Sequence, residues 1–144
     1  MAAERRKILV VEDDPDILRI LSHTLNAAGY QVVQAYGGED ALRKVKLHHP
    51  DLVLTDLAMP MMSGVEVINQ IKRDEETQHI PVIAVTAFVW DGIARSAAEV
   101  GCDGFLAKPF KSADLLREVE KHFAGEKKAP GRQLRPQGSL KLQR

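Results

Sequence analysis

Short runs of apolar residues alternate along the chain with longer stretches in which apolar and polar residues are mixed. The apolar runs are rich in Val, Ile, Leu and Ala, and several are almost uninterrupted. Such runs are typical of β-strands that are covered on both faces. The predicted strands are residues 7–11, 31–35, 51–55, 81–86 and 104–107.

The mixed stretches carry apolar residues at intervals of three or four, which predicts amphipathic helices. In the first of them, Asp14 stands at the N-cap position, Pro15 in the first turn and Gly29 at the C-terminal stop. Ser63 and Glu66 have the spacing of a capping box at the start of a later one. The predicted helices are residues 15–28, 38–48, 63–73, 91–100 and 112–124.

Five strand–helix units in strict alternation predict an α/β fold with a doubly wound, five-stranded parallel sheet and helices on both faces. In such sheets ligands bind at the carboxyl ends of the strands, near the point where the strand order changes direction. The residues that follow the strands are therefore the first candidates for a site.

Composition agrees with a single globular domain. The chain has 144 residues, of which 44% are hydrophobic and 28% charged, so it is long enough to bury a core. No apolar run approaches the roughly 20 residues of a membrane span, and the first residues make a poor signal peptide. Cys102 is the only cysteine, so we expect no intrachain disulfide, a role for Cys102 as a small core residue, and a cytoplasmic location.

Charge divides the chain into an acidic body and a basic tail. Residues 1–125 carry 14 Lys and Arg against 19 Asp and Glu, whereas residues 126–144 carry 6 against 1. The tail is rich in Gly, Pro, Gln and basic residues, which favours a flexible extension over a contact with an acidic partner, nucleic acid or membrane. It is too short and irregular for a helix-turn-helix, so we expect no DNA-binding domain.

Reactive side chains lie at four of the predicted strand ends: Glu12 and Asp13, then Asp56, Thr86 and Lys108. Clustered carboxylates repel one another unless a cation is present, and oxygen ligands without a suitable Cys or His favour Mg²⁺. An ammonium group and a hydroxyl at the same edge can bind phosphate oxygens. Together these groups predict phosphoryl transfer to a carboxylate.

Four segments carry a resemblance to a known family. VVEDD (10–14), LTDLAMPMMSG (54–64), VTA (85–87) and FLAKPF (105–110) resemble the receiver domain of two-component response regulators, over about residues 6–124. The resemblance is to single-domain receivers of the chemotaxis or cell-cycle type, and it implies a flavodoxin-like (βα)5 fold for residues 1–125.

The resemblance implies a role for each residue of the phosphorylation site. Asp56 would accept a phosphoryl group from a phosphohistidine of a histidine kinase or a histidine phosphotransfer protein. Asp13 and Asp56 would bind Mg²⁺ directly, the Ala58 backbone carbonyl would be a third ligand, and Glu12 would act through a metal-bound water.

Three further residues would bind the phosphoryl group. Lys108 would pair with the phosphoryl oxygens, Thr86 would donate its hydroxyl, and the Ala87 backbone N–H would donate another hydrogen bond. The family also implies a cis peptide bond between Lys108 and Pro109.

Phosphorylation would then change a docking surface for a downstream protein. Thr86 would move toward the phosphoryl group and Phe105 would turn into the space it leaves. The surface around Trp90, Ile93, Phe105 and the last helix, which belongs to the fourth and fifth strand–helix units, would bind the partner.

Two rival functions remain open. A Mg²⁺-dependent phosphatase with an aspartyl nucleophile would need a second Asp two residues later, where this chain has Ala58. A receiver that binds partners without phosphorylation would not need Asp13, Asp56, Thr86 and Lys108 together. We therefore expect no enzyme beyond self-catalysed phosphotransfer and dephosphorylation. Neither Ala58 nor Phe88 can orient an attacking water, so we expect the loss of phosphate to be slow; loss within seconds would contradict this.

Overall fold

The computed structural model of the chain describes residues 5–87 and 92–128. Phe88, Trp90 and residues 129–144 lie outside this part, so the expectations that concern them remain predictions. Among the described helices, none has the length and apolar character needed to cross a membrane. The elements, in chain order, are β1 (Lys7–Val11), α1 (Pro15–Ala27), β2 (Gln31–Ala35), α2 (Gly38–His48), β3 (Leu52–Asp56), α3 (Gly64–Arg73), β4 (Val82–Thr86), α4 (Gly92–Glu99), β5 (Gly104–Ala107) and α5 (Ser112–Lys128).

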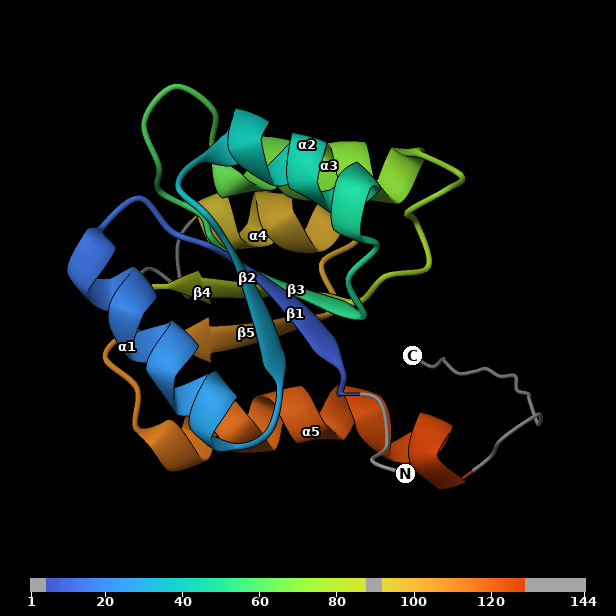
Figure 1. Cartoon of the computed structure of the whole chain (residues 1–144). Helices are drawn as coiled ribbons and strands as arrows, with labels where there is room; N and C mark the ends of the chain where they lie inside the picture. Colours follow the sequence, from blue (N-terminus) through green and yellow to red (C-terminus); the bar gives the residue numbers. More distant parts are fainter. Residues whose placement is uncertain (1–4, 88–91, 129–144) are drawn as a thin grey trace.

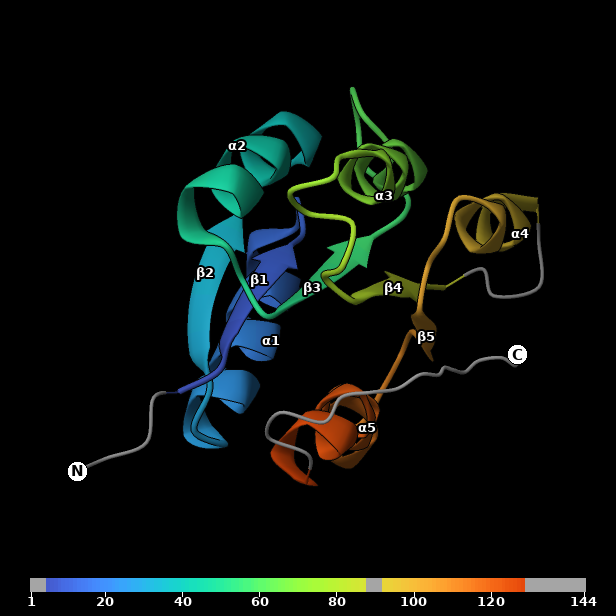
Figure 2. The same cartoon turned by 90° about the vertical axis from the view of Figure 1, so that its right-hand side faces the viewer.

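The strands form one parallel sheet in the order β2-β1-β3-β4-β5. Helices α1 and α5 cover one face, and α2, α3 and α4 cover the other (Figure 1, Figure 2). The predicted α/β fold, with a five-stranded parallel sheet and helices on both faces, is therefore confirmed. The order changes direction between β1 and β3, so the carboxyl ends of these two strands lie at the switch point where ligands bind.

Alternation along the buried strands divides the core between the two faces. On β1, Ile8 and Val10 join the cluster beneath α1 and α5, whereas Leu9 and Val11 join the cluster beneath the other three helices. All four side chains are at most 1% exposed. Burial of this kind stabilises the fold by roughly 1.5–3 kcal/mol for each large aliphatic side chain. The core on both faces fixes the positions of the strand ends.

Helix ends follow the chemistry that the sequence predicts. The Asp14 carboxylate accepts hydrogen bonds from the backbone N–H groups of Asp16 and Ile17 at the start of α1. Gly29, which follows the end of that helix, has φ of 102°, a conformation that glycine adopts without steric cost. The Ser63 hydroxyl accepts from the Glu66 N–H at 3.3 Å at the start of α3.

In the loop between β3 and α3, the backbone of Gly64 lies very close to the backbone at the end of β3. The Gly64 N–H donates to the Leu57 carbonyl at 2.9 Å. A Cβ on Gly64 would lie 2.0 Å from the backbone oxygen of Asp56, so only glycine allows α3 to begin this close to the end of β3.

All predicted boundaries except the end of α5 lie within one residue of the observed ones, and three of the differences have a local cause. Strands β3 and β4 begin one residue later than predicted, because Asp51 instead caps the Lys7 N–H through its side chain and Pro81 has no N–H to donate. Helix α5 continues four residues past its predicted end, to Lys128. Gly125 does not end the helix, because one glycine costs a helix only about 1 kcal/mol and the Glu and Lys residues that follow favour helix.

Candidate functional site

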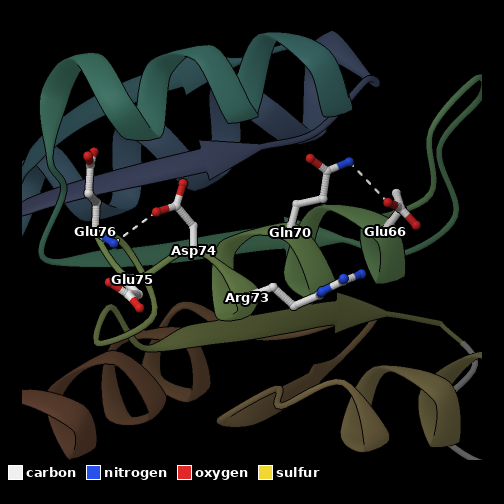
Figure 3. A pocket seen from close by; sticks show the side chains of 6 residues that line it. All are labelled: Glu66, Gln70, Arg73, Asp74, Glu75 and Glu76. Atoms are coloured by element: carbon white, nitrogen blue, oxygen red, sulfur yellow. Dashed lines mark hydrogen bonds between the residues drawn. The ribbon is translucent and has the colours of Figure 1, made fainter.

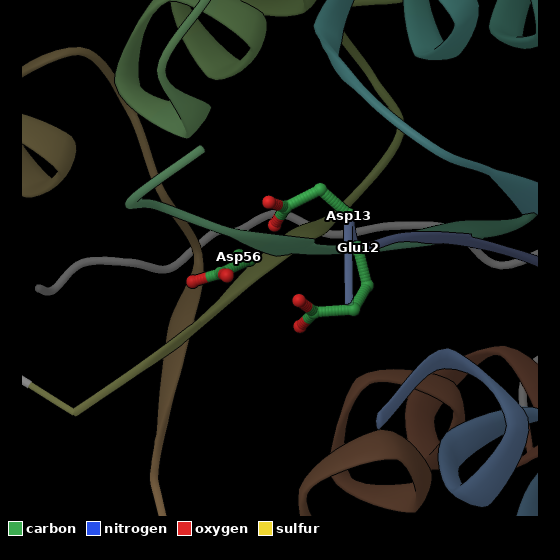
Figure 4. A group of neighbouring side chains, drawn as sticks. All are labelled: Glu12, Asp13 and Asp56. Atoms are coloured by element: carbon green, nitrogen blue, oxygen red, sulfur yellow. The ribbon is translucent and has the colours of Figure 1, made fainter. Parts of the chain in front are cut away.

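Three carboxylates meet at the switch point of the sheet. Glu12 and Asp13 follow β1, Asp56 ends β3, and one carboxylate oxygen of each lies within 4.8 Å of the others. Figure 4 shows Glu12 and Asp13 on either side of the end of β1, with Asp56 beside them. Glu12 is 1% and Asp56 7% exposed, whereas Asp13 is open to solvent.

Lys108 supplies a positive charge to this cluster from the end of β5. Its Nζ lies 3.2 Å from Glu12 Oε1 and 3.3 Å from Asp56 Oδ2. A buried carboxylate is costly unless it is paired and hydrogen-bonded, and Lys108 pairs with both of the buried ones.

Backbone N–H groups satisfy the remaining oxygens of the buried carboxylates. The Asp14 N–H donates to Glu12 Oε2 at 3.1 Å, and the Ala58 N–H donates to Asp56 Oδ1 at 3.3 Å. Asp13 makes no hydrogen bond or ion pair with the part of the chain that the structure describes, so its carboxylate is the one most available to a ligand from solvent.

The shifted pKa values show how the cluster balances its charges. Burial raises the pKa of Glu12 and outweighs the hydrogen bond from the Asp14 N–H, which lowers it. The neighbouring charge of Asp56 raises this pKa further. Burial alone would lower the pKa of Lys108, but the charges of Asp56 and Glu12 outweigh it and raise that pKa above its usual value. Lys108 therefore stays protonated between the two carboxylates.

The residues present fit a hard divalent cation. Three clustered carboxylates face a single ammonium group, which leaves an excess of negative charge, and all the available ligands are oxygens. Mg²⁺ prefers such ligands and commonly takes one or two carboxylates. Asp13 and Asp56 would hold it. Their roles, and that of the Ala58 carbonyl, stay predictions from the sequence.

The other predicted site residues lie beside the cluster. Val85 stands next to Asp56 in the sheet, so Thr86 follows directly at the end of β4. The Lys108 N–H donates to the Thr86 carbonyl at 2.9 Å, and the bond from Lys108 to Pro109 is cis, as predicted.

The predicted switch residues share one face of the sheet. Phe105 is paired with Ala84, one alternation before Thr86, and packs against the cluster beneath α2, α3 and α4. Ile93, in the first turn of α4, packs against the same cluster. Thr86 and Phe105 therefore lie on the same face of neighbouring strands, and Ile93 packs on the cluster of that face. Their role in partner binding stays a prediction.

An apolar cavity beside Lys108 was missed from the sequence. It has a volume of about 360 Å³ and is lined by Ile17, Ile20, Ala87, Lys108, Pro109 and Phe110. Ile20 lies off the predicted inward face of its helix and is 56% exposed. An isoleucine at a solvent-facing helical position was the signal that could have indicated this cavity.

A second hollow is acidic and lies away from the cluster. This groove of about 730 Å³ follows α3 and the next loop, as Figure 3 shows, and is lined by Glu66, Gln70, Arg73, Asp74, Glu75 and Glu76. Lys46 on α2 pairs with Asp74 at 2.7 Å and lowers the pKa of that carboxyl through their hydrogen bond. The groove is open to solvent, and its charges suggest solvated ion pairs and no reactive centre.

Comparison with known proteins points to one family. The family model described as response regulator receiver domain matches residues 8–120. The polar-differentiation response regulator DivK of Brucella ovis is 34% identical over 118 residues, which cover 82% of this chain and 96% of DivK. The matched part contains all four motifs at the strand ends.

Solved structures show the same similarity. The chemotaxis protein CheY4 of Vibrio cholerae has a TM-score of 0.78 and 30% identity, with 82% of this chain and 98% of that protein covered. The receiver domain of the sensor histidine kinase PA1611 of Pseudomonas aeruginosa has a TM-score of 0.79 and 30% identity, with 84% and 99% covered. It was solved with a magnesium ion coordinated in its active-site cleft.

The carboxylate cluster predicts that Mg²⁺ stabilises the folded chain. Because a ligand that binds only the folded state raises its stability, millimolar Mg²⁺ should raise the melting temperature above that in EDTA. Asp13→Asn should remove most of this increment and should be more stable than wild type in EDTA, since one repelling charge is lost. Differential scanning calorimetry measures both effects. Glu75→Gln, in the acidic groove, is the matched control and should keep the wild-type response; an equal loss in both variants would contradict a site at Asp13.

Proposed function

Because this chain belongs to the response regulator receiver domain family, we propose that it is a signalling module switched by phosphorylation of Asp56. Receiver domains take phosphate from histidine kinases and act on downstream targets. The proposal for this chain is more specific: Asp56 accepts the phosphoryl group of a phosphohistidine on a partner protein, and the surface beyond β4 and β5 then binds a target.

The position of Asp56 carries this proposal. It is a buried carboxylate at the switch point whose Oδ2 lies 3.3 Å from an ammonium group and within reach of two further carboxylates. A structural aspartate would need a partner but no second and third carboxylate. A carboxylate that accepts phosphate needs positive charge beside it, here Lys108 and a metal ion, and it needs further carboxylates to hold that metal ion.

Phosphoryl transfer forms a bond between an Asp56 oxygen and phosphorus, and it breaks the bond between phosphorus and the donor imidazole nitrogen. The imidazole leaves as a neutral ring once it is protonated. Lys108 pairs with the phosphoryl oxygens, and the Thr86 hydroxyl and the Ala87 N–H donate to them. Positioning and charge neutralisation supply most of the catalysis in such a transfer.

Asp13 and Asp56 hold Mg²⁺ in this proposal. The ion supplies the charge that neutralises the phosphoryl oxygens as they approach the acidic cluster. Its presence in the cleft of the PA1611 receiver domain supports this assignment, as does the excess of carboxylates over cations at the site.

The added phosphoryl charge favours one of two conformations of the chain. Thr86 moves toward the phosphoryl group, and Phe105, which lies on the same face, turns into the space it leaves. A shift of this kind requires only that the phosphoryl group interact better with one state than with the other. The half-buried position of Phe105 on the edge strand supports it, because the ring is not fully enclosed by the core.

A second candidate function is a receiver that binds partners without phosphorylation. A folded chain that is not phosphorylated on Asp56 would reject the first function and support this second one. An aspartyl phosphatase is disfavoured because Ala58 cannot serve as the general acid two residues after the nucleophile.

Intact-mass spectrometry after incubation with acetyl phosphate and Mg²⁺ tests the acceptor role. We expect one added phosphoryl group on the wild type, none on Asp56→Asn and none in excess EDTA. Asp51→Asn, which removes an exposed carboxylate just before the opposite end of β3, is the matched control and should be phosphorylated normally. A folded wild type that gains no phosphate from acetyl phosphate or from a phosphohistidine donor would contradict the proposal.

Amide NMR spectra test the switch. Addition of beryllofluoride, a phosphoryl mimic, should shift the signals of β5 and α4, and Thr86→Ala should lose these shifts while keeping those next to Asp56. The reason is that Thr86 links the phosphoryl group to Phe105. Thr24→Ala, on α1, should behave as wild type. Unchanged shifts of β5 in Thr86→Ala would show that another residue transmits the signal.

A further inference from the structure

The edge of the sheet at β2 is open in the part of the chain that the structure describes, because β2 pairs there only with β1. The Gln31 N–H donates to the Arg6 carbonyl at 2.9 Å, and the Ala35 carbonyl accepts from the N–H that follows β1 at 3.0 Å. In a parallel pair, only every second residue of a strand bonds to a given neighbour. Val32 and Gln34 therefore direct their N–H and C=O groups outward, where they can pair with another strand.

A groove of about 400 Å³ follows this open edge between α1 and α2. Figure 2 shows β2 at the left edge of the sheet. The lining residues come from both helices and from the strand, and are Ser22, Asn26, Val32, Val33, Gln34, Tyr36, Lys44 and His48. The groove thus combines open backbone groups with side chains from both faces of the sheet.

The two walls of the groove differ in polarity. On the α2 side, Val33 is half-buried, and Leu47, three residues after Lys44 on that helix, is 65% exposed. On the α1 side, the groove is lined by Ser22 and Asn26, which are polar. Because side chains alternate between the two faces of a strand, a strand that fits this groove should alternate apolar and polar residues.

Residues 139–143 of the basic tail have this pattern. Leu140 and Leu142 alternate with Ser, Lys and Gln, which is typical of a half-buried strand. The segment has the same length as β2, which has five residues. Residues 129–138, which precede it, are rich in Gly, Pro, Gln and Arg, a composition typical of a linker.

The end of α5 lies close to the start of β2. The ring centroid of Phe123 is 5.9 Å from that of Tyr30, which directly precedes β2, and the Arg6 guanidinium is 4.6 Å from the centroid of the same Phe123 ring. The helix ends at Lys128, about 7.5 Å further along its axis. A ten-residue linker spans roughly 33 Å when extended, so residues 139–143 can begin at the amino end of β2 and run parallel to it.

The connection would also have the usual hand. Helices α1 and α5 cover the same face of the sheet (Figure 1), and the path from β1 through α1 to β2 crosses it in the same direction as a path from β5 through α5 to the outer side of β2. The two connections therefore share one hand, and such connections in parallel sheets are right-handed in about 98% of cases.

We propose that residues 139–143 bind in the groove of their own chain and add a sixth, parallel strand to the sheet beside β2, with Leu140 and Leu142 facing α2. The Gln34 carbonyl accepts from Lys44 Nζ at 2.7 Å, and its second lone pair can accept from the added strand. The added strand would cover an edge that could otherwise pair with another chain. This inference does not depend on phosphorylation of Asp56.

Amide hydrogen exchange on the full chain tests the pairing. Because backbone hydrogen bonds slow exchange, the N–H groups of Val32 and Gln34 should exchange about tenfold faster in a variant that combines Leu140→Ser with Leu142→Ser than in wild type. Leu134→Ser, in the preceding linker, is the matched control and should exchange as wild type. The N–H groups of β2 that face β1 should be unchanged in every variant. Equal exchange at the two outward positions in all three proteins would overturn the proposal.

Concentration and salt separate this strand from other occupants of the groove. Exchange at Val32 and Gln34 should not change over about a hundredfold range of protein concentration, and sedimentation should show a monomer. Protection that rises with concentration, together with a dimer, would place the segment on a second copy and overturn the proposal. The protection should persist in about 0.5 M salt, which screens exposed charges. Its loss in salt, or an equal loss in Leu134→Ser, would indicate an unspecific contact of the basic tail and would also overturn the proposal.

Discussion

An ammonium group held between two buried carboxylates is the interaction on which the rest of the site depends. Lys108 Nζ lies 3.2 Å from Glu12 and 3.3 Å from Asp56, and so connects the ends of β5, β1 and β3. Alone, the two acids would have to give up their charge or remain exposed to water. Paired with Lys108 they stay buried, and together with Asp13 they still leave an excess of negative charge. That excess favours a divalent cation, and in the proposed function the cation would allow a phosphoryl group to approach an acidic cluster.

The parallel sheet explains why these groups meet. Every strand of the sheet directs its carboxyl end to the same edge, so groups up to 96 residues apart in the chain lie within hydrogen-bond distance. The change of strand order places β1 and β3, which carry the acids, at the centre, and β4 and β5, which carry Thr86 and Lys108, to one side. Gly64 lets α3 begin directly against Asp56. The proposed acceptor, Lys108 and the predicted switch residues therefore share one framework with the hydrophobic core.

Local chemistry explains how much of this could be predicted from the sequence. The fold follows from alternating strand and helix patterns, and the caps at Asp14 and Gly29 follow from backbone chemistry that acts within a few residues. The meeting of Asp13, Asp56 and Lys108 follows from a general rule for parallel sheets. The direct contact of Glu12 with Lys108 could not be predicted, because it depends on side-chain length and orientation across distant strands. The cavity at Ile20 was missed because the packing between elements decides it. The last turn of α5 was missed because the helix preference of the residues after Gly125 outweighs the cost of that glycine.

The central claim is that Asp56, and no other carboxylate of the cluster, receives the phosphoryl group. The most direct measurement is to phosphorylate the chain from a phosphohistidine donor, reduce it with borohydride and map the peptides by tandem mass spectrometry. Reduction converts an aspartyl phosphate into homoserine, so the account predicts homoserine at position 56 alone. Homoserine at position 13, the corresponding reduction product at Glu12, or an unmodified Asp56 in a protein that has gained phosphate would contradict it.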